Sequence, residues 1–163
     1  MATSVTLLGT KGGPAIRKGG PSPTSSLLDV DGKIYVIDCG LGVTRGFVEA
    51  GHSLKSLSTI FITHHHSDHN LEFGNLIHTA WTTGLATPVR AYGAKGLAGM
   101  WPDFCRLNRF DIATRMAELL GAGQRIISCH LGGSSSLCAI RDGKSMATSL
   151  GMSPQSGVLH NNR

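Results

Sequence analysis

The chain has 163 residues, of which 40% are hydrophobic and 15% charged, and its formal net charge is +5. This length permits one domain with a real core, and the composition excludes an intrinsically disordered chain. With only 6% aromatic residues, dedicated nucleic-acid recognition is not expected. The basic residues Lys11, Arg17 and Lys18 are interpreted as part of a solvated loop.

The first part of the chain predicts a series of short strands with one helix. The pair Asp31-Gly32 between two apolar runs is a strong signal for a hairpin turn. The elements expected before residue 63 are strands at 4–9, 25–30, 33–38 and 58–62, a glycine- and proline-rich loop at 10–24, and a helix from Val43 to Ala50 that ends at Gly51.

Residues 63–70 read Thr-His-His-His-Ser-Asp-His-Asn and directly follow an apolar strand. Imidazole and carboxylate are the ligands that zinc prefers. His64 and His66 are two residues apart at a strand end, so they point the same way and can share one ion. Asp68 and His69 are placed to reach a second ion. The segment therefore predicts a site for one or two Zn²⁺ ions, or for Mn²⁺, with a solvated histidine cluster as the alternative.

This His-x-His-x-Asp-His motif resembles that of the metallo-β-lactamase superfamily, in particular its ribonuclease Z and arylsulfatase-like branch. The stretches 5–13, 25–38 and Ile37-Asp38-Cys39-Gly40 resemble the strands that lead to the metal site in that family. The resemblance runs from about Val5 to about Gly96. It implies a zinc-dependent hydrolase in which metal-bound water attacks a phosphodiester, an ester or a sulfate, with Asp68 as the catalytic residue.

The same family takes further metal ligands from segments later in the chain. After Gly96 nothing resembles those segments, and the only histidines beyond His78 are His130 and His160. A catalytic zinc normally has three protein ligands and an open position. The chain is therefore expected to carry half of a dinuclear site and to be impaired as a hydrolase.

The part after the histidine motif predicts further helices and strands around an irregular junction. Phe73, Leu76, Ile77, Ala80 and Trp81 recur at helical spacing, which indicates a core-facing stripe. The expected elements are a helix from Leu71 to Thr83, a strand from Pro88 to Tyr92, an irregular junction at 98–110, a helix from Asp111 to Leu120 with Asp111 as N-cap, and strands at 125–130, 136–141 and 144–148.

Residues 116–163 are similar to the central part of acetate kinases. The stretch from His130 to Ser136 contains Gly132 and Gly133, which match the turn by which that family approaches phosphate, and Arg163 falls where it keeps an arginine near the transferred phosphoryl group. The resemblance implies that His130, Gly132, Gly133 and Arg163 contact a phosphate-bearing cofactor. From the residues alone, a plain hairpin corner at the two glycines is an equally good interpretation.

We therefore predict an α/β (α+β) chimera: half of a metallo-β-lactamase αββα sandwich joined to an acetate-kinase-like helix and β-hairpin segment. The expected parts are 1–97, a junction at 98–110, and 111–163. Three functions stay open: a zinc hydrolase acting on a small-molecule or phosphodiester substrate, acetate-kinase-like phosphoryl transfer, and a non-catalytic metal-binding scaffold. Such truncated parts are also expected to self-associate.

The four cysteines, Cys39, Cys105, Cys129 and Cys138, show no Cys-x-x-Cys spacing. Free cysteine in apolar surroundings behaves as a small hydrophobic residue. No apolar run reaches membrane-spanning length, and no signal-peptide pattern opens the chain. A reduced cytoplasmic protein that does not enter membranes is the expectation.

Overall fold

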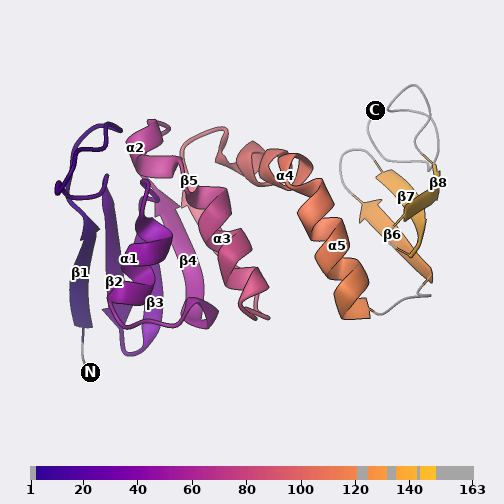
Figure 1. Cartoon of the computed structure of the whole chain (residues 1–163), viewed down its shortest axis with the longest axis horizontal. Coiled ribbons are helices and arrows are strands. Elements are labelled where there is room, and N and C mark those ends of the chain that lie inside the picture. The colour runs from indigo at the N-terminus through magenta and orange to yellow at the C-terminus, as the bar shows by residue number, and fades with distance from the viewer. Residues whose placement is uncertain (1–2, 121–124, 132–134, 143, 150–163) are drawn as a thin grey trace. The chain divides into compact units, whose positions relative to one another are not determined.

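The computed structural model describes residues 3–120, 125–131, 135–142 and 144–149. The chain divides into two compact units, Met1–Phe104 and Cys105–Arg163 (Figure 1). Each unit is described by itself. Within the described residues, no helix combines the length and the apolar character that crossing a bilayer requires.

The first unit is built on a five-stranded sheet whose strands lie in sequence order. The strands are β1 (Thr3–Gly9), β2 (Ser25–Val30), β3 (Lys33–Ile37), β4 (Leu57–Ile62) and β5 (Arg90–Gly93). β1, β2 and β3 pair antiparallel, whereas β3–β4 and β4–β5 pair parallel. The predicted hairpin is confirmed, because Asp31 and Gly32 join β2 to β3 with φ angles of 51° and 82°.

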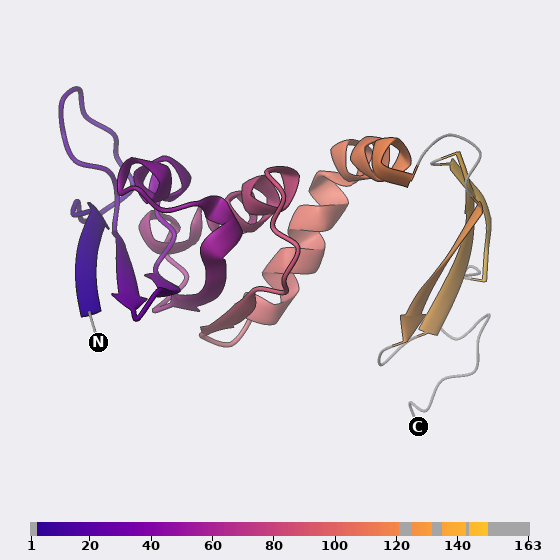
Figure 2. The same ribbon diagram turned by 90° about the horizontal axis from the view of Figure 1, so that it is seen from below.

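Helices cover one face of this sheet. They are α1 (Val43–Glu49), the 3-10 turn η1 (Leu54–Ser56), α2 (Ser67–Asn70), α3 (Phe73–Thr82) and α4 (Leu97–Leu107). Figure 2 shows α1 and α3 on the same side of the strands. The core lies between them, where Phe47 of α1 and Leu76 of α3 pack with Leu27, Val36 and Ile60 of the sheet.

The expected helix from Leu71 to Thr83 is present as α3, which begins two residues later, at Phe73, and ends at Thr82. The short helix α2 precedes it, within the histidine motif, where no helix was expected. The apolar stripe of α3 faces the core as predicted, since Phe73, Leu76 and Ala80 are buried.

The prediction of an irregular junction at 98–110 is wrong, because α4 occupies residues 97–107 and the next helix begins at Arg109. Leu97 is buried, and Met100 and Trp101 pack against the core. Trp101 also stacks on Phe104 with ring centroids 5.7 Å apart. The positions 97, 100, 101 and 104 follow helical spacing, but Pro102 within the helix conceals it in the sequence.

The second unit contains α5 (Arg109–Leu120) and a three-stranded antiparallel sheet in the order β6-β7-β8. The strands are β6 (Arg125–Leu131), β7 (Ser135–Arg141) and β8 (Lys144–Thr148), which confirms the three predicted strands. α5 begins two residues earlier than expected. Asp111 therefore lies in its first turn instead of capping it, and it pairs with Arg115 at 2.9 Å.

Candidate metal centre

The histidine motif lies at the carboxyl ends of β3 and β4. These strands are parallel neighbours, so the residues that follow them, Asp38 and Thr63, meet at one edge of the sheet. The Asp38 N–H donates to the carbonyl oxygen of Phe61 at 2.7 Å, which fixes the turn after β3. Asp38 has a φ of 63°, a left-handed conformation that aspartate tolerates better than most residues.

The buried carboxylate of Asp38 holds two groups of the motif. It accepts hydrogen bonds from the Thr63 backbone N–H at 2.8 Å and from the Thr63 hydroxyl at 2.9 and 3.0 Å. Its Oδ2 lies 2.7 Å from Nδ1 of His69. A proton on Nδ1 donates to this carboxylate, so the lone pair of Nε2 becomes available to a ligand.

The other predicted ligands gather around His69. The ring centroid of His64 lies 4.0 Å from that of His69 and 4.7 Å from that of His66. Oδ2 of Asp68 lies 3.4 Å from Nε2 of His69. The structure thus brings together His64, His66, Asp68 and His69. The neighbouring His65 does not belong to this group, because its Nε2 lies 3.0 Å from the carbonyl oxygen of Lys95.

Asp68 also connects the motif to the glycine-rich loop after β1. The backbone N–H of Gly13 donates to Oδ2 of Asp68 at 2.7 Å. This hydrogen bond is the main reason that the pKa of Asp68 lies below its ordinary value, with smaller contributions from His69 and His66. Asp68 is therefore a carboxylate at neutral pH, the form in which it can bind a cation or accept a proton.

Cys39 and Glu72 lie close by but have structural contacts. Burial raises the pKa of the Cys39 thiol well above its usual range, and the charges of Asp38 and Glu72 raise it further. The side chain is fully buried in the hydrophobic core, where it packs as a small apolar group. Glu72 accepts hydrogen bonds from the backbone N–H groups of Gly42 and Thr44, at 2.8 and 3.2 Å, and so caps the start of α1.

The donors at this site fit a divalent cation in kind: imidazole nitrogens and an ionised carboxylate, with one imidazole oriented by a second carboxylate. Among the described residues, no group of three or more His, Cys, Asp or Glu side chains is arranged to hold a metal ion. The four-residue ligand set stays a prediction. The sequence indicated that the stretch Ile37-Asp38-Cys39-Gly40 leads to the metal site, but it did not predict a role for the side chain of Asp38.

The predicted phosphate-contacting residues are mostly outside the described part of the chain. Gly132, Gly133 and Arg163 lie there. The backbone of His130 belongs to β6, where it pairs with Ser136 of β7. These assignments stay predictions.

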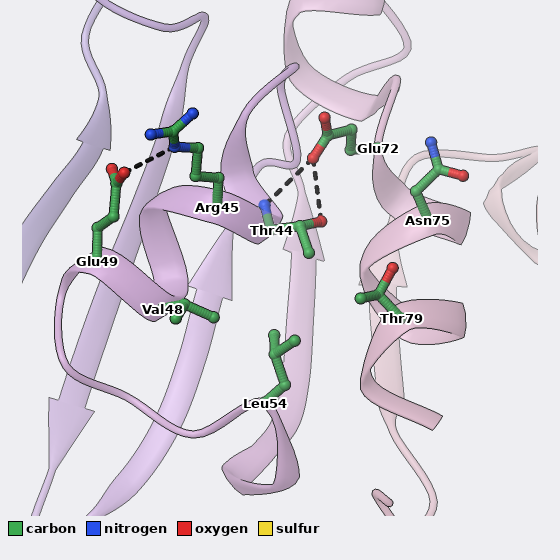
Figure 3. A pocket seen from close by; sticks show the side chains of 8 residues that line it. All are labelled: Thr44, Arg45, Val48, Glu49, Leu54, Glu72, Asn75 and Thr79. Atoms are coloured by element: carbon green, nitrogen blue, oxygen red, sulfur yellow. Dashed lines mark hydrogen bonds and ion pairs between the residues drawn. The ribbon is translucent and has the colours of Figure 1, made fainter. Parts of the chain in front are cut away.

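An open pocket of about 610 Å³ lies on the helical layer, apart from the histidine motif (Figure 3). It is lined by Thr44, Arg45, Val48, Glu49, Leu54, Glu72, Asn75 and Thr79. Its charged groups are engaged, since Arg45 pairs with Glu49 at 2.7 Å and Glu72 caps α1. The pocket contains none of the predicted metal ligands, so it does not form part of the candidate centre.

Two family models match the chain. The model described as the acetokinase family matches residues 60–163, and the model described as anti-Pycsar protein Apyc1 matches residues 3–83. Both matches include residues 60–83, which contain the histidine motif and α3.

Curated relatives are ribonucleases Z. The chain is 33% identical over 118 residues to ribonuclease Z of Mycolicibacterium gilvum (strain PYR-GCK), a match that covers 70% of this chain and 40% of that protein. It is 38% identical over 117 residues to ribonuclease Z of Mycobacterium sp. (strain KMS), with the same two shares. The chain thus spans about 40% of the length of these relatives. These matches are longer than the stretch from Val5 to Gly96 to which the sequence resemblance was assigned.

Solved structures agree with this likeness. The short form of human tRNase Z superposes with a TM-score of 0.56 at 27% identity, covering 66% of this chain and 40% of that one. The metallo-β-lactamase fold protein YhfI from Bacillus subtilis superposes with a TM-score of 0.50 at 15% identity, covering 88% of this chain and 60% of that one. The second likeness concerns the fold alone.

Proposed function

We propose a metal-dependent hydrolase half-site, because the chain has a metallo-β-lactamase fold related to that of ribonuclease Z. The chain also belongs to the acetokinase family, whose model matches residues 60–163. The histidine motif binds zinc and serves the hydrolysis of a phosphodiester, an ester or a sulfate. The chain spans about 40% of the length of its ribonuclease Z relatives. Hydrolysis, the activity of those whole proteins, is therefore assigned to this chain as a proposal.

The observation that carries the proposal is the contact between Asp38 and His69. A histidine that binds a metal usually donates its other ring N–H to a carboxylate or a carbonyl, which fixes both the tautomer and the ring orientation. The separation of 2.7 Å between Oδ2 of Asp38 and Nδ1 of His69 meets that requirement. A solvated histidine cluster has no need of a buried carboxylate behind one of its rings.

Each residue then has a defined task. His64, His66 and His69 supply imidazole nitrogens, and Asp68 supplies a carboxylate that Gly13 keeps ionised and in place. Zinc, when bound, supplies a water molecule with a pKa lowered toward neutrality. The ionised Asp68 would be the group that accepts a proton in the reaction. These four residues are expected to bind zinc more weakly than the full ligand set of an intact dinuclear enzyme.

Zinc binding is the first test. After zinc loading and gel filtration, elemental analysis should find metal on the native chain, and competition with a chromophoric chelator should give its affinity. The double variant His64→Ala/His66→Ala should lose this binding because it removes two of the ligands. His65→Ala is the matched control, since His65 contacts the carbonyl of Lys95 instead.

Absence of metal above background on the native chain, or equal binding by the double variant, would reject the site. Hydrolysis is tested separately, with an activated phosphodiester in the presence of zinc or manganese. Asp68→Asn should then abolish any turnover, whereas turnover that survives this substitution would remove Asp68 from the reaction.

The second candidate is acetate-kinase-like binding of phosphate and transfer of a phosphoryl group to a carboxylate. The acetokinase match favours it. The third candidate, a non-catalytic metal-binding scaffold, corresponds to zinc binding without turnover. Metal analysis, the hydrolysis assay and an assay for acetyl phosphate together distinguish all three.

A further inference from the structure

The loop after β1 is fixed at its base by backbone hydrogen bonds. The Lys11 N–H donates to the carbonyl oxygen of Ser22 at 3.0 Å, and the Thr24 hydroxyl donates to the carbonyl oxygen of Lys11 at 3.2 Å. The Gly40 N–H in turn donates to the carbonyl oxygen of Thr24 at 3.1 Å. The two ends of the loop are thus tied to each other and to the turn after β3, which gives the backbone of Lys11 a defined place.

The next two residues, Gly12 and Gly13, have the least restricted backbone that a chain can have. Gly13 has a φ of 81°, in the left-handed region. Neither residue has a side chain that could hold the loop, yet the Gly13 N–H donates to Oδ2 of Asp68 at 2.7 Å. A group outside the two glycines has to fix the orientation of this N–H.

The ammonium group of Lys11 is such a group. Its Nζ donates to the carbonyl oxygen of Gly12 at 2.9 Å and to that of Gly13 at 3.0 Å. Hydrogen bonds from a charged donor are roughly twice as strong as those between neutral groups. The interpretation of Lys11 as one of several solvated residues does not account for these two contacts.

One peptide unit lies between two opposite charges. The peptide bond between Gly12 and Gly13 is trans, so the C=O of Gly12 and the N–H of Gly13 point in opposite directions. The oxygen accepts from the ammonium of Lys11, and the N–H donates to the carboxylate of Asp68. The dipole of the peptide is thus aligned with both charges, and a rotation of the peptide would break both hydrogen bonds together.

We propose that Lys11 is a positioning residue of the candidate metal centre: by binding the two carbonyl oxygens, it aims the Gly13 N–H at Asp68 and holds that carboxylate in place. The inference rests on the proposed function, because its consequence is for metal binding. Lys11 acts through the peptide and is not itself a ligand. Its charge alone would have the opposite effect, since a cation near the site repels Zn²⁺.

Zinc affinity, measured by chelator competition on the full chain, separates the two effects by their sign. Lys11→Met keeps the aliphatic chain and removes the donors, so it should lower zinc affinity about tenfold, within the usual cost of losing a group that orients a metal ligand. Lys18→Met is the matched control, because Lys18 lies in the same loop and is exposed. It should leave the affinity unchanged or raise it slightly. Unchanged or raised affinity in Lys11→Met overturns the proposal.

Hydrogen exchange of the Gly13 amide, followed by NMR on the full chain at neutral pH, tests the same arrangement without metal. Lys11→Met should speed this exchange about tenfold, the equivalent of one hydrogen bond to a charged group. Asp68→Ala should do the same, and the double variant should exchange no faster than either, because both substitutions remove one interaction.

A general loss of stability would instead speed exchange throughout β1 to β4 and would add to the effect of Asp68→Ala. That result, or slow exchange of Gly13 in Lys11→Met, overturns the proposal. A native chain that binds no zinc, but whose Gly13 amide responds as expected, rejects the metal centre and supports the arrangement of Lys11 and Asp68. Zinc binding that Lys11→Met does not weaken rejects the role of Lys11 alone.

Discussion

The buried carboxylate of Asp38 is the residue on which the candidate site depends most. It is 3% exposed and joins the turn after β3 to Thr63 and His69. Its influence on a bound metal would be indirect, because it contacts the imidazole of His69 and is not one of the four predicted ligands. Removing its charge should therefore change affinity without removing a ligand.

We expect Asp38→Asn to lower zinc affinity about 10- to 100-fold, the usual cost of losing a partner behind a metal-binding histidine. The chelator competition assay measures this. Asp31→Asn is the matched control, because Asp31 also has a positive φ, 51°, but lies in the β2–β3 turn. Equal affinity of Asp38→Asn and the native chain would mean that the orientation of His69 does not limit binding.

At this scale the sequence predicts a ligand set of His64, His66, Asp68 and His69. The structure places these side chains close together, and their role as metal ligands stays a prediction. The sequence did not predict the partners of these residues. The contact between Asp38 and His69 crosses 31 residues, and that between Gly13 and Asp68 crosses 55. No periodicity within one segment reports such contacts. The first arises from the pairing of β3 with β4, and the second from the approach of the loop after β1 to the histidine motif.

Helices α3 and α4 approach each other so closely at Gly74 that no side chain larger than hydrogen fits there. A Cβ at Gly74 of α3 would overlap the ring of Phe104, whereas a Cβ at Gly99 of α4 meets nothing within 4 Å. These two helical glycines therefore form a natural pair, in which one is required for packing and the other is not.

Gly74→Ala should lower the free energy of unfolding by about 1–3 kcal/mol, the usual cost of overpacking a core. Gly99→Ala should raise it by about 0.5 kcal/mol, because alanine loses less backbone entropy than glycine on folding. Urea unfolding followed by circular dichroism measures both. A stabilising Gly74→Ala would show that the Phe104 ring moves aside freely.

Sequence periodicity identified every strand of both sheets and the core stripe of α3, but it did not identify α4. Its apolar positions at Leu97, Met100, Trp101 and Phe104 are helical in spacing, yet a proline interrupts them. Packing against the core stabilises a helix whose local signals are poor. Local propensity alone therefore could not reveal it.

At the scale of the whole molecule, the boundary between the two compact units falls between Phe104 and Cys105 in the chain, within α4. The acetokinase match begins at residue 60, well before the resemblance identified in the sequence, and overlaps the match to the first unit. The boundaries expected at 97 and 111 stay predictions.

We predict that the chain does not form acetyl phosphate from ATP and acetate. Phosphoryl transfer depends on holding both substrates in line, and the first unit, up to Phe104, is a mixed sheet of metallo-β-lactamase fold. A hydroxamate assay for acetyl phosphate measures the activity. Product that requires both substrates, and that Arg163→Ala abolishes, would contradict the prediction and make the C-terminal segment the functional one.

The arrangement of β1 to β5 also has a consequence for the order of folding. β2 and β3 are joined by a two-residue turn and can pair early, because little chain entropy opposes a local contact. The parallel pairs β3–β4 and β4–β5 must first close loops that contain α1 and α3. The histidine motif follows β4, so its geometry is acquired late, after the slowest pairings in the first unit have formed.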